Sequence, residues 1–292
     1  MPATIMVLAT PKHRHDDPPD GEVLAHCAAT LANLAEDRRN QLQMPKDGAY
    51  EPLCRLAQVD LTQVDMNGDG DIDGYGDGGV MHSDVSRCLC SLSSRVENVG
   101  SCGGGTPFGP SELQALFHLA GGTCAPHNEH CRKDALVALG NLAITAKSQQ
   151  AIAKLGGVPC LALGLASEFT SCRLYAARAL YRVGVLPENQ PLLVSAGAVP
   201  PLIQLSGDGR DVEVQRCAVM ALCNATVRVK HANENSRKIF ELFVYIKKLF
   251  AFSNVWVFQK GVPFPHLIIT TCPTSCVRHR PTLPMRSLLV PN

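Results

Sequence analysis

CRKDALVALGNLA (Cys131–Ala143) is one of three segments that share a helical pattern, the others being CRLYAARALYRVG (Cys172–Gly184) and QRCAVMALCNATV (Gln215–Val227). Their alignment places three leucines in register, 41 and then 42 residues apart: Leu139, Leu180 and Leu222. In each segment, apolar residues recur at three- and four-residue spacing, which is typical of an amphipathic helix. A helical pattern that repeats with a period near forty residues predicts an α-solenoid.

Each repeat is predicted to contain three helices. AGAVPPLIQL (Ala196–Leu205) matches LGGVPCLALGL (Leu155–Leu165), and in both a glycine separates two short helical patterns. Glycine favours the left-handed conformation that ends many helices, so it should end the first helix, for example Glu188–Val194. The pair Pro200–Pro201 should open the second helix, and Asp211 should cap the third.

Less regular copies precede these repeats, one at Cys27–Ala57 and a degraded one at Val85–Ser94 and Ser111–Ala120. The chain is therefore divided into four predicted regions: 1–58, a partial and a first full repeat; 59–82, a flexible Asp/Gly-rich insertion; 83–241, one degenerate and then regular repeats; and 242–292, a non-repeat tail, disordered or loosely packed. The chain begins inside a repeat, and no glycine turn follows Phe240 where one is due. We therefore expect a fragment or variant of a longer array.

The segment Asn189–Ala225 resembles an armadillo repeat, and residues 5–240 are similar to an array of such repeats. In kind they are most similar to the vacuolar and plant-type armadillo-repeat scaffolds. The resemblance implies an all-α fold, a right-handed α-α superhelix whose third helices line a concave groove. It also implies a non-enzymatic scaffold or adaptor that binds a partner peptide or protein along that groove.

The same resemblance implies candidate partner-binding residues. In family members that bind extended peptides, an asparagine near the end of each third helix hydrogen-bonds the peptide backbone, because an amide offers a donor and an acceptor. Asn33, Asn141 and Asn224 match that position, whereas the degenerate repeat has a serine there, Ser93 or Ser94. The alternative is that these asparagines only cap helix ends.

Arginine replaces asparagine in one repeat, where Arg182 follows Arg178 by one helical turn. These two complete the predicted partner-binding set and would suit an acidic partner, although the pattern favours a solvated helix face. Family members that recognise lysine-rich import signals carry a tryptophan one turn before the asparagine. This chain has Ala29, Val137 and Met220 there, which argues against that specificity.

The acidic segment DMNGDGDIDGYGDGG (Asp65–Gly79) resembles a calcium loop of the EF-hand kind. The candidate metal ligands are Asp65, Asn67, Asp69, Asp71 and Asp73. Gly70 has the required place, but the twelfth position, which needs a bidentate acid, is Gly76. The pattern therefore favours a solvated acidic insertion and no cofactor, with calcium binding, and a calcium-responsive interaction module, as the alternative.

Composition limits the remaining functions. Hydrophobic residues make up 46% and charged residues 18% of the chain, and the net charge is +1, which gives no argument for nucleic-acid binding. No run reaches transmembrane length, while peripheral membrane association through a partner stays open. The thirteen cysteines, an odd number, favour a reducing compartment, so we expect a cytoplasmic protein, with the nucleus as the alternative. The sequence shows no nucleophile–base pattern that would indicate an active site. A separate alternative to the scaffold function is that the chain is the substrate-binding part of a larger protein of the ubiquitin-ligase type.

Overall fold

The computed structural model describes residues 21–59, 77–95, 98, 108–121, 128–208 and 210–226. The chain divides into two units, Met1–Ile246 and Lys247–Asn292, and all of these residues belong to the first. The candidate calcium ligands and the predicted tail at 242–292 therefore lie outside the described residues. Within the described ranges, twelve α-helices and one short 3-10 helix form, with no strand.

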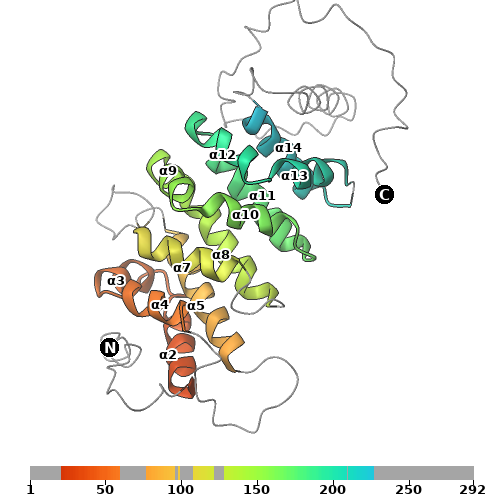
Figure 1. The fold of residues 1–292 in the computed structure, drawn as a ribbon. Coiled ribbons are helices and arrows are strands. Elements are labelled where there is room, and N and C mark those ends of the chain that lie inside the picture. The colour runs from red at the N-terminus through yellow and green to blue at the C-terminus, as the bar shows by residue number, and fades with distance from the viewer. Residues whose placement is uncertain are drawn as a thin grey trace, which may run out of the picture. The chain divides into compact units, whose positions relative to one another are not determined.

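The five longest helices are the third helices of successive repeats: α2 (Gly21–Leu34), α5 (Asp77–Ser93), α8 (Glu129–Leu142), α11 (Thr170–Val183) and α14 (Val212–Thr226). They pack in chain order, each against the next (Figure 1). The three leucines that set the repeat register are all buried in this stack, with Leu139 and Leu180 fully inaccessible. Burial of this row of apolar side chains stabilises each repeat through its neighbours.

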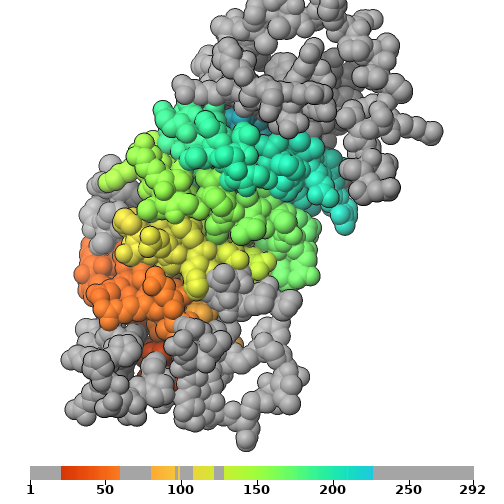
Figure 2. All heavy atoms as spheres, in the orientation of Figure 1, coloured from red at the N-terminus to blue at the C-terminus, as the bar shows by residue number. Residues whose placement is uncertain are grey.

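The second helices form a parallel row: α4 (Tyr50–Ala57), α7 (Pro110–Ala120), α10 (Gly157–Leu165) and α13 (Val199–Gly207). First helices precede three of them: α3 (Asn40–Lys46), α9 (Ala146–Lys154) and α12 (Gln190–Ser195), the last extended by the 3-10 helix η2 (Pro187–Asn189). Figure 2 shows the side chains of successive repeats in direct contact along one face. The predicted armadillo-type helical solenoid is confirmed.

The predicted turn between first and second helices is confirmed. Gly48, Gly156 and Gly197 separate these helices in three repeats, with φ of 88°, 87° and 72°. Only glycine adopts this left-handed conformation without strain, which explains its recurrence. The predicted cap is also present, since Oδ1 of Asp211 accepts the backbone N–H groups of Glu213 and Val214 at 2.9 and 3.1 Å.

Buried amide side chains join the repeats. Nδ2 of Asn189 donates to the carbonyl of Val183, at the end of the preceding third helix, at 3.0 Å. It also donates to the carbonyl of Gln149, in the preceding first helix, at 3.1 Å. Asn98 makes the same pair of bonds in the degraded repeat, to the carbonyls of Leu92 and Gln41. The carbonyls of Val183 and Leu92 lie at the ends of third helices, where intrahelical donors run out, so the amides satisfy groups that burial would otherwise penalise. The carbonyls of Gln149 and Gln41 belong to first helices, so the same amides also join those helices to the next repeat.

The insertion predicted at 59–82 is shorter at its C-terminal end than expected. Helix α5 begins at Asp77 and not near Ser83, because Met81 and His82 are buried and extend the packed face of the helix by about one turn. The sequence prediction missed this because the glycines next to Asp77 disfavour a helix when considered alone.

None of the nine cysteines among the described residues takes part in a disulfide. Burial raises the pKa of the Cys88 and Cys160 thiols to about 12, so they act as small apolar side chains. No helix in the described ranges has the length and apolar character needed to cross a lipid bilayer.

Candidate partner-binding face

The amide caps fix the register of the third helices. Asn40, Asn98 and Asn189 each donate to a carbonyl six residues earlier, in the last turn of the preceding third helix. The carbonyls belong to Leu34, Leu92 and Val183. In each helix, we call the position immediately before this residue the ladder position. With α8 and α14 placed by the aligned leucines, the ladder residues are Asn33, Ser91, Asn141, Arg182 and Asn224.

This register corrects one expectation. The degenerate repeat has Ser91 at the ladder position, not Ser93 or Ser94, because α5 carries leucines at both Leu89 and Leu92 and the sequence alone did not decide between them. Ser93 has a different role, since its hydroxyl donates to the carbonyl of Cys90 at 2.7 Å.

Each of the last three ladder residues binds the third helix before it. Asn224 donates through Nδ2 to the carbonyl of Tyr181 at 2.8 Å, and Arg182 donates through Nη1 to the carbonyl of Gly140. Asn141 donates to the Ser93 hydroxyl at 3.2 Å, so its contact with α5 is relayed through that side chain. The ladder residues therefore cap the last turn of the neighbouring helix, a role closely related to the capping alternative considered above.

Capping uses only part of each amide. Asn141 and Asn224 are half-buried, and each makes one hydrogen bond to the described part of the chain, through Nδ2. An amide has two N–H donors and an oxygen with two lone pairs. One N–H and the oxygen therefore remain for a further partner, on a side chain that the first bond already orients.

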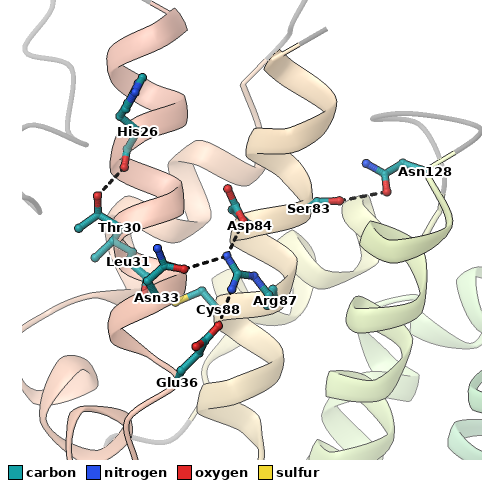
Figure 3. Close-up of polar contacts among 10 residues, drawn as sticks. All are labelled: His26, Thr30, Leu31, Asn33, Glu36, Ser83, Asp84, Arg87, Cys88 and Asn128. Carbon is teal, nitrogen blue, oxygen red and sulfur yellow. Dashed lines mark hydrogen bonds and ion pairs between the residues drawn. The ribbon is translucent and has the colours of Figure 1, made fainter. Parts of the chain in front are cut away.

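Asn33 differs from Asn141 and Asn224, because its amide oxygen already accepts a hydrogen bond from an arginine of the chain. Nη2 of Arg87 donates to Asn33 Oδ1 at 3.2 Å, and Arg87 also pairs with Asp84 at 2.7 Å and Glu36 at 2.6 Å (Figure 3). The hydrogen bond to Asp84 is the main cause of the raised pKa of Arg87. This network joins α5 to α2, so the amide oxygen of Asn33 is engaged within the chain.

One turn before the ladder residues, the five third helices carry Ala29, Arg87, Val137, Arg178 and Met220. No aromatic side chain stands at this level in the described helices, as the sequence showed. Two of the five are arginines, in α5 and α11, and only Arg87 has carboxylate partners in the described ranges.

Arg178 and Arg182 lie on the same side of α11, four residues apart. The guanidinium of Arg178 lies over the ring of Tyr175, with Cζ 5.4 Å from the ring centroid. Burial, followed by the charge of Arg178, lowers the pKa of Arg182. Two half-buried guanidinium groups thus lie on one side of α11, near enough for the charge of Arg178 to affect Arg182.

The predicted metal ligands remain untested, because residues 60–76 are outside the described ranges. Among the described residues, no group of three or more His, Cys, Asp or Glu side chains is placed to hold a metal ion.

The comparisons with known proteins agree with this geometry. The model of the armadillo/beta-catenin-like repeat family matches residues 187–227, the repeat formed by η2, α12, α13 and α14. No curated protein sequence matches the chain.

Several solved structures share the fold. One is a crystal structure of an engineered protein, 20% identical, with a TM-score of 0.58 over 85% of this chain and 90% of its own. Another is a designed armadillo repeat protein, 17% identical, with a TM-score of 0.58 over 86% of this chain and 92% of its own. A third, 17% identical with a TM-score of 0.52 over 84% and 98%, is a designed armadillo repeat protein in complex with the peptide (KR)4. The chain therefore folds as an armadillo-repeat solenoid, and its residues 187–227 belong to the armadillo/beta-catenin-like repeat family.

Proposed function

We propose that the protein is a non-enzymatic scaffold or adaptor that binds an extended segment of a partner protein along its third helices. The observation that carries this proposal is that the side-chain amides of Asn141 and Asn224, at ladder positions, each make only one hydrogen bond to the described part of the chain. Each keeps a donor and an acceptor for a ligand, and a peptide unit presents the complementary acceptor and donor.

Orientation makes such amides effective. An asparagine already held by one hydrogen bond loses less conformational freedom when it binds a second group, so more of the interaction energy appears as affinity. A designed armadillo repeat protein of the same fold is described in complex with a peptide, which supports the use of this fold for peptide binding. The partner-facing region runs from α8 to α14, since Asn33 at the α2 end already binds Arg87.

The test compares two double variants of the full chain in affinity capture from cell extract with quantitative mass spectrometry. In N141A/N224A the ladder amides are removed. In Q150A/Q204A two exposed amides on a first and a second helix, away from the ladder, are removed as the matched control. Helix content by circular dichroism should be retained by both variants, since each ladder residue contributes one capping bond of about 1 kcal/mol.

We expect partners that wild type captures to be lost by N141A/N224A and kept by Q150A/Q204A. With a purified captured partner, the ladder variant should bind about tenfold or more weakly in a direct titration. Equal capture by both variants would show that binding does not use the ladder amides of Asn141 and Asn224. Repeating the capture with a calcium chelator tests the rival module, because only that alternative requires all partners to be lost on chelation.

A further inference from the structure

We propose that Arg178 and Arg182 on α11 form a docking site for acidic side chains, so that the partner segment carries aspartate or glutamate where it crosses this helix. This inference rests on the proposed function and specifies its partner. The site combines two guanidinium groups on one helix face with an absence of carboxylates around them in the described ranges.

Helix α11 has an uncompensated positive charge. Its fourteen residues include three arginines and no aspartate or glutamate. The first of these, Arg173, donates to the carbonyls of Ser167 and Glu168 at 2.8 and 2.7 Å and so is occupied at the start of the helix. Arg178 and Arg182 form no ion pair with any described residue. The uncompensated charge of α11 is therefore located on these two side chains.

The neighbouring third helices do not neutralise them. Helices α8 and α14 carry three acidic side chains, and each has a partner of its own. Glu129 accepts a hydrogen bond from Ser171, Asp134 lies 3.3 Å from Lys133, and Glu213 lies 2.6 Å from Arg216. A carboxylate that neutralises the pair must therefore come from outside the described residues.

Both guanidinium groups are already oriented. Arg182 is held by its bond to the carbonyl of Gly140, and Arg178 by its stacking on Tyr175. The planar guanidinium binds a carboxylate through two parallel N–H groups, and it keeps free donors after a single bond to a carbonyl. Partial burial removes water from the site, which strengthens attraction to a carboxylate and makes two adjacent like charges unfavourable without one.

The surroundings favour a peptide over a nucleic acid. Asn141 and Asn224 flank the arginines on α8 and α14 and suit peptide units, as described above. Ile144 and Val185 follow the ladder residues of α8 and α11 by three positions and are 56% and 46% exposed, which suits apolar side chains of a protein. The charge does not continue as a basic track, since the only other arginine at this level, Arg87, is already paired with Asp84. A polyanion needs such a track.

The experiment measures fluorescence anisotropy of labelled octapeptides on the full 292-residue chain. The acidic probe is (DE)4, and the matched neutral probe is (NQ)4, in which every carboxylate is replaced by the amide of the same shape. The test variant is R178Q/R182Q. The control variant, R38Q/R210Q, removes the same charge from two exposed arginines outside the third helices.

We expect wild type to bind (DE)4 at least about tenfold more tightly than (NQ)4, with an affinity that falls as salt is added. R178Q/R182Q should remove this preference, and R38Q/R210Q should keep it. The single variant R178Q, which leaves the Arg182 bond to Gly140 intact, should lose a large part of the preference and guards against a folding effect of the double change.

Equal binding of the two octapeptides, or an equal loss in both double variants, would overturn the proposal. Tighter binding of a labelled oligothymidylate than of (DE)4, lost in R178Q/R182Q, would also overturn it in favour of a nucleic acid. These outcomes are separate from failure of the scaffold function, because partner capture that depends on Asn141 and Asn224 can persist without any preference for acidic peptides.

Discussion

His82 is the most unusual side chain of the solenoid at the scale of single residues. It is 1% exposed, its ring nitrogens have no hydrogen-bond partner among the described residues, and its ring lies 6.5 Å from that of His118. Burial is the main cause that lowers its pKa to about 4, and His118 adds to the effect. The nearby backbone of Leu56 and Val59, which does not reach hydrogen-bond geometry with the ring, opposes the shift but does not outweigh burial. The imidazole is therefore neutral in the folded protein near neutral pH.

This depressed pKa makes stability depend on pH. The unfolded histidine titrates near 6.5, so below that pH the unfolded state binds a proton that the folded state excludes. The contribution is fully present above pH about 6.5 and is lost as the pH falls toward about 4. We expect wild type to lose about 2 kcal/mol from this residue between pH about 7.5 and about 5. Urea denaturation at both pH values measures the loss.

Substituting the histidine isolates its contribution. H82L should reduce the pH-dependent loss by that amount, while H26L, at an exposed position, should leave the loss as it is in wild type. An identical pH dependence in wild type and H82L would contradict the assignment.

At the scale of helices and turns, the joints between repeats depend on buried amides. Asn189, 2% exposed, donates to two carbonyls from two different helices, whereas Asn40 makes one such bond, to the carbonyl of Leu34. Removing a buried donor leaves its acceptor without a partner, at a cost of about 1 to 3 kcal/mol for each group. The two positions therefore allow a graded comparison.

We expect N189A to lower the free energy of unfolding by about 2 to 4 kcal/mol and N40A by about half as much. Chemical denaturation monitored by circular dichroism measures both. A smaller loss for N189A than for N40A would mean that the second bond, to the carbonyl of Gln149, contributes nothing to stability.

The periodic elements were predictable from the sequence, and the joints were not. The leucine register and the glycine turns are local patterns, so the three-helix repeat followed from residues such as Leu139, Leu180 and Gly197. The bond from Asn189 to Gln149 spans 40 residues, and its partner is known only once the repeats are stacked. The candidate face shows the same limit. Its asparagines were found by position, but their bonds to the preceding helix, and the occupation of Asn33 by Arg87, depend on packing.

At the scale of the whole molecule, the acidic segment Asp65–Gly79 follows α4 in the chain and runs into the start of α5 at Asp77. Its sequence lacks the bidentate ligand that a tight calcium loop requires at its twelfth position. We expect isothermal titration calorimetry of the full chain to give calcium affinity in the millimolar range or weaker, with D65N/D69N behaving as wild type. Micromolar affinity that D65N/D69N abolishes would establish a specific calcium site. It would then favour the calcium-responsive interaction module as the function of the protein.

The hydrogen bonds described above that amide and guanidinium groups donate between repeats run in one direction along the chain. In every one described above, the donor belongs to the later repeat and the acceptor to the earlier one, as in Asn224 to Tyr181, Arg182 to Gly140 and Asn189 to Gln149. A repeat emerging from the ribosome therefore brings its donors to carbonyls that are already in place. At these joints a partly synthesised array presents unmatched carbonyls, which water satisfies more readily than buried N–H groups. These amide and guanidinium bonds can thus form one repeat at a time, in the order of translation, without waiting for residues still to be made.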